Sequence, residues 1–441
     1  MALTNCQDGE PRVSASEGIS RVPAWKVRSR AVYTNNPDHG CMRGYGTIQA
    51  IFALETHMDA LARELKIDPA ELRLMNLMEE GDKLITTDKV HDIHIRQTME
   101  TALERSDYWN KKRNLPPNHG IGIANIVKTV GLLGSSANVR LNEDGTITIT
   151  TAAVEIGTGT HTVLTQIATE VLGVTMDRVT VGAPDSDSAP FDVGSIASHT
   201  VFDNGNAVRL ASEDLARKIA EQTATAMGEE VGDIVVSKGR AHPVLHPEGG
   251  LTLEEVAGTS TYAFGGPLVG LGSWMGSKPH DEPVEGGFAE GTYPTFAFGT
   301  HVAEVEIDPD TGQVATVGYT ACHDVGKAIN PLALEGQIEG GITQGLGGSL
   351  WEEILITNGK IKNPNFVDYR LSTTLDTPAI AIDLVEQPDQ LGSFGARGVG
   401  EHPIVGPGPA IANAVAAVAG VDITQIPVTP ERLTTAIDRA Q

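Results

Sequence analysis

Apolar side chains recur at helical spacing early in the chain. In residues 47–67, TIQAIFALETHMDALARELKI, they are three to six positions apart, at Ile48, Phe52, Met58, Leu61 and Leu65. This period is typical of a helix that buries one face. The next stretch, residues 68–78, starts a second helix, with Asp68 as N-cap, Pro69 at the first helical position and Glu71 completing a capping box.

The same kind of pattern predicts further helices over residues 90–109 and 201–227. Residues 25–34, WKVRSRAVYT, alternate instead and predict a strand. Between the early helices and the rest, residues 111–120, KKRNLPPNHG, contain two prolines and a glycine and are typical of a linker. We therefore expect the chain to divide into residues 1–118 and 119–441.

Beyond residue 119 the pattern predicts hairpins that are followed by helices. Residues 138–157, NVRLNEDGTITITTAAVEIG, alternate on both sides of a turn at 142–145, and residues 300–326 do so around DPDTG. A helix is expected after each hairpin, so strand, turn, strand and helix occur twice, which suggests a weak internal duplication. A short strand, DRVTVGAP, follows the first helix. The predicted fold class is α+β, with mixed sheets and helices opened by Gly-rich turns.

Composition and charge narrow the classes of function. The 441 residues include 57 acidic and 32 basic side chains, a formal net charge of −25, so a nucleic-acid backbone would be repelled. The 49 glycines indicate many tight turns. There is no stretch of about 18 apolar residues and no signal-peptide pattern, so we expect a cytoplasmic protein that does not bind membranes.

The sequence motifs of several common enzymes are missing. Cys6, Cys41 and Cys322 form no CxxC pair, and their spacing from histidines fits neither zinc nor an iron–sulfur cluster. The sequence has no P-loop, no GxGxxG dinucleotide motif and no GxSxG nucleophile motif. Arg43 next to Cys41 could lower the pKa of that thiol, although an inert buried thiol is the simpler interpretation.

Five glycine-rich segments stand out, and most of them precede an expected helix. They are residues 40–49 (GCMRGYGTIQ), 154–162 (VEIGTGTHT), 193–200 (VGSIASHT), 341–348 (GITQGLGG) and 395–401 (GARGVGE). Free backbone N–H groups at a helix start bind anions, so several converging turns would suit a large phosphate-bearing cofactor. In the last segment Glu401 is either a charge at a helix start or a catalytic base.

In sequence order, these segments resemble the molybdenum subunit of the xanthine dehydrogenase and aldehyde oxidase family. MRGYGTIQ is similar to that family's Arg-Gly-aromatic-Gly loop, VEIGTGTHT to its Glu-x-Gly-x-Gly loop, and ASHT to its Ala-Ser loop. GQIEGGITQGLG and GVGEHP resemble its last two signatures. The likeness extends over essentially the whole chain from about residue 20.

The resemblance implies specific roles. Glu401 would be the general base that deprotonates a molybdenum-bound hydroxide, with water as the source of the inserted oxygen. Residues near the molybdenum, the pterin or its pyrophosphate would be Arg43, Gly44, Gly157, Thr158, Gly159, Ala197, Ser198, Thr200 and Gln344. Tyr45 would lie against the substrate ring, no second such aromatic is evident, and Lys128 could attract a substrate carboxylate.

The resemblance also implies a larger enzyme. The family's molybdenum subunit is normally about twice as long, so residues 1–118 would end its first cofactor-binding domain and residues 119–441 would form its second. We expect the C-terminal half of a split subunit, as in nicotinate dehydrogenase, whose partners are the other half, a [2Fe–2S] subunit and an FAD subunit. The cofactor would be molybdopterin, in its cytosine dinucleotide form.

The substrate class stays open at this point. An N-heterocycle such as a nicotinate or a purine is favoured, and an aldehyde is an alternative. A reductive member that acts on aryl-CoA, a carbon monoxide dehydrogenase and a non-catalytic scaffold are the other candidates.

Overall fold

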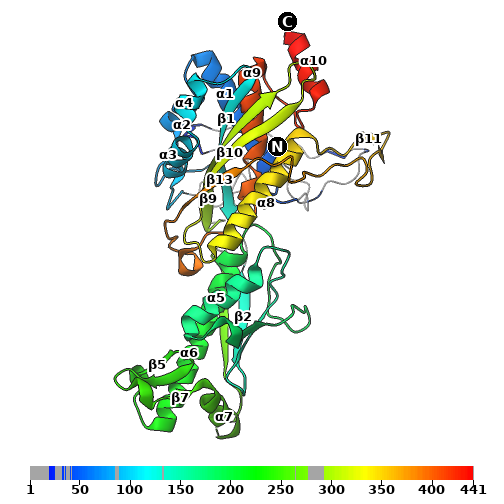
Figure 1. Ribbon diagram of the computed structural model, residues 1–441. Coiled ribbons are helices and arrows are strands. Elements are labelled where there is room, and N and C mark those ends of the chain that lie inside the picture. The colour runs from blue at the N-terminus through cyan, green and yellow to red at the C-terminus, as the bar shows by residue number, and fades with distance from the viewer. Residues whose placement is uncertain are drawn as a thin grey trace.

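The computed structural model describes residues 19–24, 32–33, 35, 40, 42–84, 89–131, 134–263, 265–276 and 293–440. These residues form an upper and a lower lobe (Figure 1). Most of the strand expected at 25–34 lies outside the described residues, as do Cys6 and Cys41. The mixed α+β class is confirmed.

The two lobes are built around sheets of the same design. In each sheet three antiparallel strands are followed by a parallel fourth strand. The upper sheet has the order β1 (His119–Val130), β9 (Thr295–Ile307), β10 (Val314–Asp324) and β13 (Ile380–Val385). The lower sheet has the order β8 (Val269–Trp274), β2 (Ser135–Leu141), β3 (Ile147–Thr151) and β4 (Val179–Val181).

The helix after each hairpin completes the repeat. Helix α5 (Thr160–Leu172) joins β3 to its parallel neighbour β4, and α8 (Pro331–Leu350) joins β10 to β13. Both hairpins turn where the sequence predicts. The structure therefore supports the internal duplication inferred from the sequence.

Helices cover both faces of the upper sheet. Ile121 and Ile123 of β1 belong to one apolar cluster and Ala124 to another, as expected for a strand buried on both sides. Helix α9 (Pro407–Ala419) packs so closely on β1 that a Cβ on Gly122 would lie 2.3 Å from the Ala410 carbonyl oxygen. Helices α1 (Thr47–Leu65) and α3 (Ile95–Arg105) complete the upper lobe with α2 (Pro69–Asn76), α4 (Tyr108–Arg113) and α10 (Pro430–Ala440).

Two predictions near the start of the chain need comment. Asp68 caps α2 as expected, because its side chain accepts the Ala70 N–H at 2.7 Å. The single helix expected over 90–109 is instead α3 and α4, separated at Asp107, whose φ of 53° interrupts the helix. The predicted linker is correspondingly shorter, since its first residues belong to α4 and β1 begins at His119.

The lower lobe contains the long helix α6 (Gly205–Met227), which packs with α5 on its sheet. A short π-helix, η2 (Thr200–Asn204), precedes α6 where the sequence suggested an ordinary α-helix. A small sheet of β5 (Ile234–Ser237), β6 (Arg240–Pro243) and β7 (Leu251–Thr252) lies at the far end with α7 (Leu253–Ala263). The whole lobe is inserted between β1 and β9, which are neighbours in the upper sheet.

One glycine-rich segment is not a turn. Residues 341–348 lie inside α8, which corrects their interpretation as a helix-opening loop. Helical glycine is costly relative to alanine, so close packing has to compensate. A Cβ on Gly341 or Gly345 would meet Pro403 or Pro407 at 2.7 or 2.6 Å, so these glycines let α8 approach the turn that follows Glu401.

Candidate active site

Glu401 lies on a turn between two short 3-10 helices, η5 (Ser393–Gly395) and η6 (His402–Ile404). The turn touches the loop before α6: Glu401 N–H donates to Ser198 Oγ at 3.0 Å. A Cβ on Gly398 would lie 1.7 Å from the Ser198 carbonyl oxygen, so only glycine fits there. Since Ser198 belongs to the lower lobe, this contact joins the lobes beside the carboxylate.

The Glu401 carboxylate is held by partners at both of its oxygens. Lys128 Nζ lies 3.1 Å from Oε2, and the Gly44 N–H donates to Oε1 at 3.4 Å. Oε2 is buried and accepts no hydrogen bond from any described residue. The ion pair at this oxygen therefore has the right distance but not hydrogen-bond directionality. The carboxylate is therefore held in place by Lys128 and by the backbone of Gly44.

A cavity of about 550 Å³ opens in front of Glu401. Both lobes line it: the loop at 195–200 belongs to the lower lobe, whereas β1 and the turn before α1 belong to the upper lobe. It brings together most of the residues expected at the site, namely Arg43, Tyr45, Lys128, Thr158, Ala197, Ser198, Thr200 and Glu401. Ala197 and Ser198 have left-handed φ values of 49° and 52°, an unusual backbone that is common at functional sites.

At the edge of this cavity, Arg43 forms hydrogen bonds to the Glu401 turn and to helix α8. Its Nε donates to the Gly400 carbonyl at 2.6 Å, and one terminal nitrogen donates to the Gln337 carbonyl at 3.1 Å. The other terminal nitrogen reaches Gln344 Oε1 at 3.4 Å. Burial lowers the pKa of Arg43. Gln344 thus supports Arg43 and lines neither cavity.

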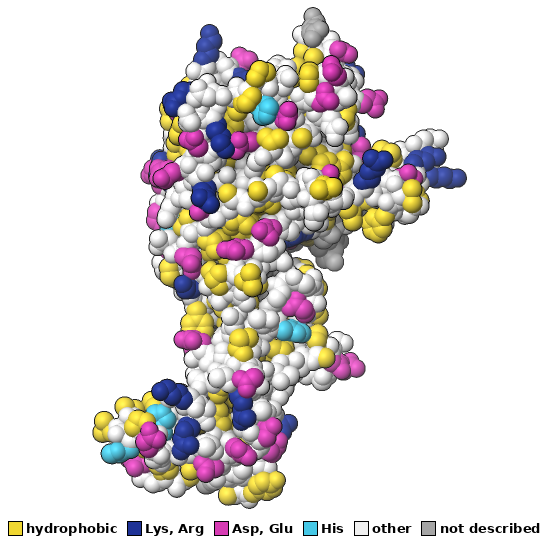
Figure 2. Space-filling model, viewed as in Figure 1, with side chains coloured by type: hydrophobic (Ala, Val, Ile, Leu, Met, Phe, Trp, Pro, Cys, Tyr) yellow, Lys and Arg dark blue, Asp and Glu magenta, His cyan; other side chains and the backbone are white. Residues whose placement is uncertain are grey.

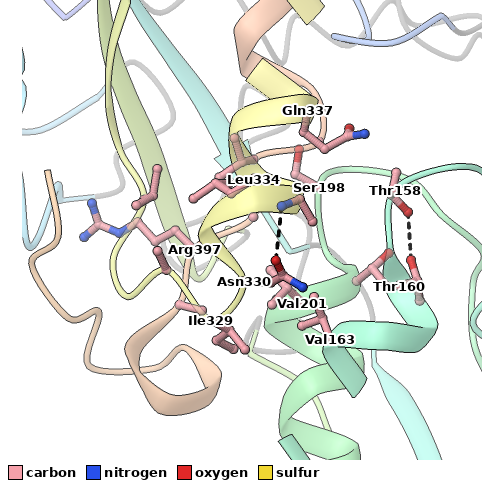
Figure 3. A pocket seen from close by; sticks show the side chains of 18 of the residues that line it. Thr158, Thr160, Val163, Ser198, Val201, Ile329, Asn330, Leu334, Gln337 and Arg397 are labelled. Atoms are coloured by element: carbon pink, nitrogen blue, oxygen red, sulfur yellow. Dashed lines mark hydrogen bonds between the residues drawn. The ribbon is translucent and has the colours of Figure 1, made fainter. Parts of the chain in front are cut away.

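A second, smaller cavity of about 130 Å³ adjoins the first (Figure 3). Thr158 and Thr160 lie on one side, their hydroxyls hydrogen-bonded to each other at 2.8 Å, and the α8 N-cap Asn330 lies on the other with Leu334 and Gln337 of α8. Hydroxyls and amides dominate its polar lining, whereas the cations Lys327 and Arg397 are already paired with carboxylates of the chain itself. This donor set suits a phosphate-bearing group.

The glycine turn before α5 differs from a simple anion site. Its amides at Gly157, Gly159 and His161 donate to the Glu155 carboxylate at 2.7, 3.1 and 3.3 Å. Burial opposes ionisation of Glu155, and these backbone bonds nevertheless lower its pKa. The chain's own carboxylate therefore occupies the helix start, and Thr158 is the residue of this turn that lines both cavities.

The structure adds residues that the sequence did not single out. Tyr293 lines the larger cavity together with Tyr45, and Gln337 lines both cavities. Tyr293 lies two residues before β9, whose Ala297 pairs with Lys128. Only the pairing of β1 with β9, which local sequence does not reveal, could have placed this aromatic opposite the site.

The histidine after Glu401 turns away from the cavity. His402 is fully buried, and its ring lies 4.7 Å from that of His323, which in turn is 3.2 Å from His301 between ring nitrogens. Burial lowers the pKa of His402 well below its usual value. Within the described residues, no group of three His, Cys, Asp or Glu could hold a metal ion. Cys322 is likewise buried, which raises its pKa to about 12.

Comparison with known families agrees with this geometry. Residues 94–378 match one family model described as a molybdopterin cofactor-binding domain, and residues 11–77 match another. The chain belongs to the molybdopterin-binding proteins of the xanthine dehydrogenase family.

Individual relatives are consistent with that assignment. A putative xanthine dehydrogenase molybdenum-binding subunit of Escherichia coli K12 is 33% identical, over 93% of this chain and 55% of the relative. The large subunit of nicotine 6-hydroxylase from Paenarthrobacter nicotinovorans is 27% identical, over 94% and 53%. The crystal structure of quinoline 2-oxidoreductase from Pseudomonas putida 86 matches with a TM-score of 0.79 at 27% identity, over 90% and 52%. The chain thus spans about half the length of these relatives.

Proposed function

We propose that this chain is the molybdenum-cofactor-binding part of a molybdenum hydroxylase that oxidises an N-heterocyclic aromatic compound. Water is the oxygen source, and electrons pass to [2Fe–2S] and FAD partner subunits. The observation that carries this proposal is the Glu401 carboxylate, which lines the larger cavity and is ion-paired with Lys128.

The two cavities fit the cofactor. The smaller one offers hydroxyl and amide donors for a pyrophosphate, and we assign Thr158, Ser198, Thr200, Asn330 and Gln337 to it. Gly157 has open space around the position of a Cβ, so a large group can approach its backbone. We propose the cytosine dinucleotide form of molybdopterin, which when bound supplies the centre that accepts two electrons from the substrate.

Within this site Glu401 is the general base. Its carboxylate accepts the proton of the water-derived oxygen nucleophile, while the Gly44 N–H and the Lys128 ammonium hold the carboxylate in place. A positioned base of this kind contributes about 10²–10⁴ in rate. Arg43 and Ser198 fix the turn that carries Glu401.

The larger cavity favours a flat substrate. Tyr45 and Tyr293 both line it, so two aromatic side chains are available for a heterocyclic ring. An aldehyde substrate is the second candidate, because the relatives include an aldehyde oxidoreductase of Megalodesulfovibrio gigas. A substrate screen over nicotinate, purines, quinolines and aldehydes separates the two.

The decisive experiment replaces Glu401 with glutamine in the assembled enzyme. The amide keeps the shape of the side chain and cannot accept the proton. Turnover is expected to fall about 10²–10⁴-fold, with molybdenum content and assembly unchanged by elemental analysis and gel filtration. Undiminished turnover in a Glu401→Gln enzyme with full molybdenum content would show that Glu401 is not the general base.

The rest of the enzyme is also part of the proposal. We propose that residues 1–118 and 119–441 belong to two cofactor-binding domains, that a further portion of the molybdenum subunit completes the site, and that the complex is cytoplasmic. In the parts of the chain that the structure describes, no helix is long and apolar enough to span a bilayer.

A further inference from the structure

An extended arm on the upper lobe exposes many large apolar side chains. The arm, residues 354–375, leaves the end of α8 and returns to β13 (Figure 1). Its regular structure in this range is the two-residue pair β11 (Ile356–Thr357) and β12 (Lys360–Ile361). The exposed apolar residues are Ile354, Leu355, Ile361, Phe366, Val367, Leu371 and Leu375, with exposures from 42% at Ile361 to 96% at Leu375.

These side chains gather on one projecting feature. Figure 2 shows hydrophobic atoms along the arm where it leaves the body, with Lys and Arg at its tip. Single exposed apolar residues are ordinary on protein surfaces, whereas a cluster on one segment marks an interaction site. Among the described residues, few hydrogen bonds hold the arm to the rest of the chain, including Tyr369 Oη to Glu352 at 2.8 Å and Ser372 Oγ to the Thr343 carbonyl at 3.2 Å.

The arm meets helix α8 at one end of an open stripe. Leu332, Gly336, Gly340 and Thr343 are spaced four, four and three residues apart, so they share one face of α8. Leu332 is 83% exposed, and no described atom would lie within 4 Å of a Cβ on Gly336 or Gly340. Unlike Gly341 and Gly345, these two glycines are explained by no packing within the described residues.

We propose that the arm and this stripe of α8 are the docking surface for the portion of the molybdenum subunit that this chain does not span. This inference rests on the proposed function for the identity of the partner. The relatives are about twice as long as the matched region, so in them a portion of comparable length accompanies it in one chain. The partner presents an apolar face to Phe366 and Val367, with carboxylates opposite Lys360 and Lys362, and its backbone comes close to α8 at Gly336 and Gly340.

Other exposed parts of the chain carry weaker indications. Helix α8 also positions Gln337 and Gln344 beside Arg43, so a partner docked on the stripe would lie next to the two cavities.

Leu245 in the lower lobe is 84% exposed, yet it does not belong to a segment with many exposed apolar residues. It therefore provides a matched control residue.

The test measures assembly and not turnover. This chain, carrying an affinity tag, is co-produced with the remaining portion of the subunit, and the molar ratio of the two is measured after purification. The variants are Phe366→Asp with Val367→Asp, and Gly340→Leu. The wild type and Leu245→Asp are expected to retain the partner at an equal molar ratio. In both surface variants the molar ratio of partner to tagged chain is expected to fall at least about tenfold.

Folding is followed by thermal melting of the same samples. The mutated side chains are exposed or face open space, so the chain itself should melt as the wild type does. Retention of the partner by both surface variants would overturn the proposal. A second result would also overturn it: dimers of the wild-type chain, detected by light scattering, that the arm variant no longer forms. The surface would then bind a second copy of this chain. Failure of the proposed function would appear instead as an active, fully assembled Glu401→Gln enzyme.

Discussion

Replacing Gly398 with alanine tests the contact that joins the two lobes at the active site. The new Cβ would lie 1.7 Å from the Ser198 carbonyl oxygen, and real Cβ contacts essentially never fall below 3.0 Å, so the two segments must separate by about 1.3 Å. The obstacle is backbone, which cannot rotate away as a side chain can. Overpacking of this kind costs about 1–3 kcal/mol.

Gly400, two residues further along, provides the matched control. A Cβ there would have its nearest neighbour at 3.7 Å, an ordinary contact. The assay is the melting temperature of each variant under identical conditions. At about 2–4 °C per kcal/mol for a unit of about 150–250 residues, Gly398→Ala should melt roughly 2–12 °C below the wild type. Gly400→Ala should remain close to the wild type.

A second readout follows from the position of Ser198. Because Ser198 lines both cavities, its displacement should also lower the molybdenum content of Gly398→Ala. If the two variants melted within about 1 °C of each other and bound equal amounts of metal, the close approach of the turn and the loop would not constrain the site.

Three further substitutions test other parts of the structure. Arg73→Met should destabilise the chain by about 3–5 kcal/mol in thermal or denaturant unfolding, because it leaves the buried carboxylates of Glu55 and Asp59 without their partner; Arg21→Met, at an exposed pair, should cost about 1 kcal/mol or less, and equal losses would contradict the argument. Lys128→Met should reduce kcat at least about tenfold at unchanged metal content, whereas a loss confined to the KM of carboxylate-bearing substrates would show that Lys128 binds substrate instead. Burial lowers the pKa of His323 from 6.5 to about 3, so the unfolded chain takes up a proton that the folded chain refuses, and stability falls as the pH drops below 6.5. His323→Asn should therefore lose about 2 kcal/mol less than the wild type between about pH 7 and pH 5, and an unchanged pH dependence of unfolding would refute this.

The sequence predicted those parts of the fold that depend on local pattern. The hairpins at 142–145 and 308–312, the cap at Asp68 and most helices follow from alternation, helical period and turn residues. The prediction of one continuous helix over 90–109 was wrong, because Asp107 adopts a left-handed conformation that the spacing of apolar residues does not indicate. The glycines of 341–348 were interpreted as a turn because their packing partners, Pro403 and Pro407, lie about 60 residues away in sequence.

The site shows the same limit. Glu401, Arg43 and Ser198 could be proposed from motifs in a fixed order along the chain. Tyr293, Gln337 and Asn330 could not, because their positions depend on strand pairing and on which face of α8 lies toward the lower lobe. The pairing of Glu155 with its own turn was also invisible, since a carboxylate next to a glycine turn can point either toward a ligand or back to the chain.

The insertion of the lower lobe between β1 and β9 has a mechanical consequence. Both strands that lead to the lower lobe end side by side, where Val130 of β1 pairs with Thr295 of β9, so the chain joins the lobes at one edge and not at two separate points. A rotation of one lobe about this edge would change the gap between the Ser198 loop and the Glu401 turn, and with it the distance from Glu401 to a bound substrate. A cofactor bound by Thr158 and Ser198 of the lower lobe and by Gln337 of the upper lobe would connect the two lobes. Cofactor binding would then also fix the width of the gap between the Ser198 loop and the Glu401 turn.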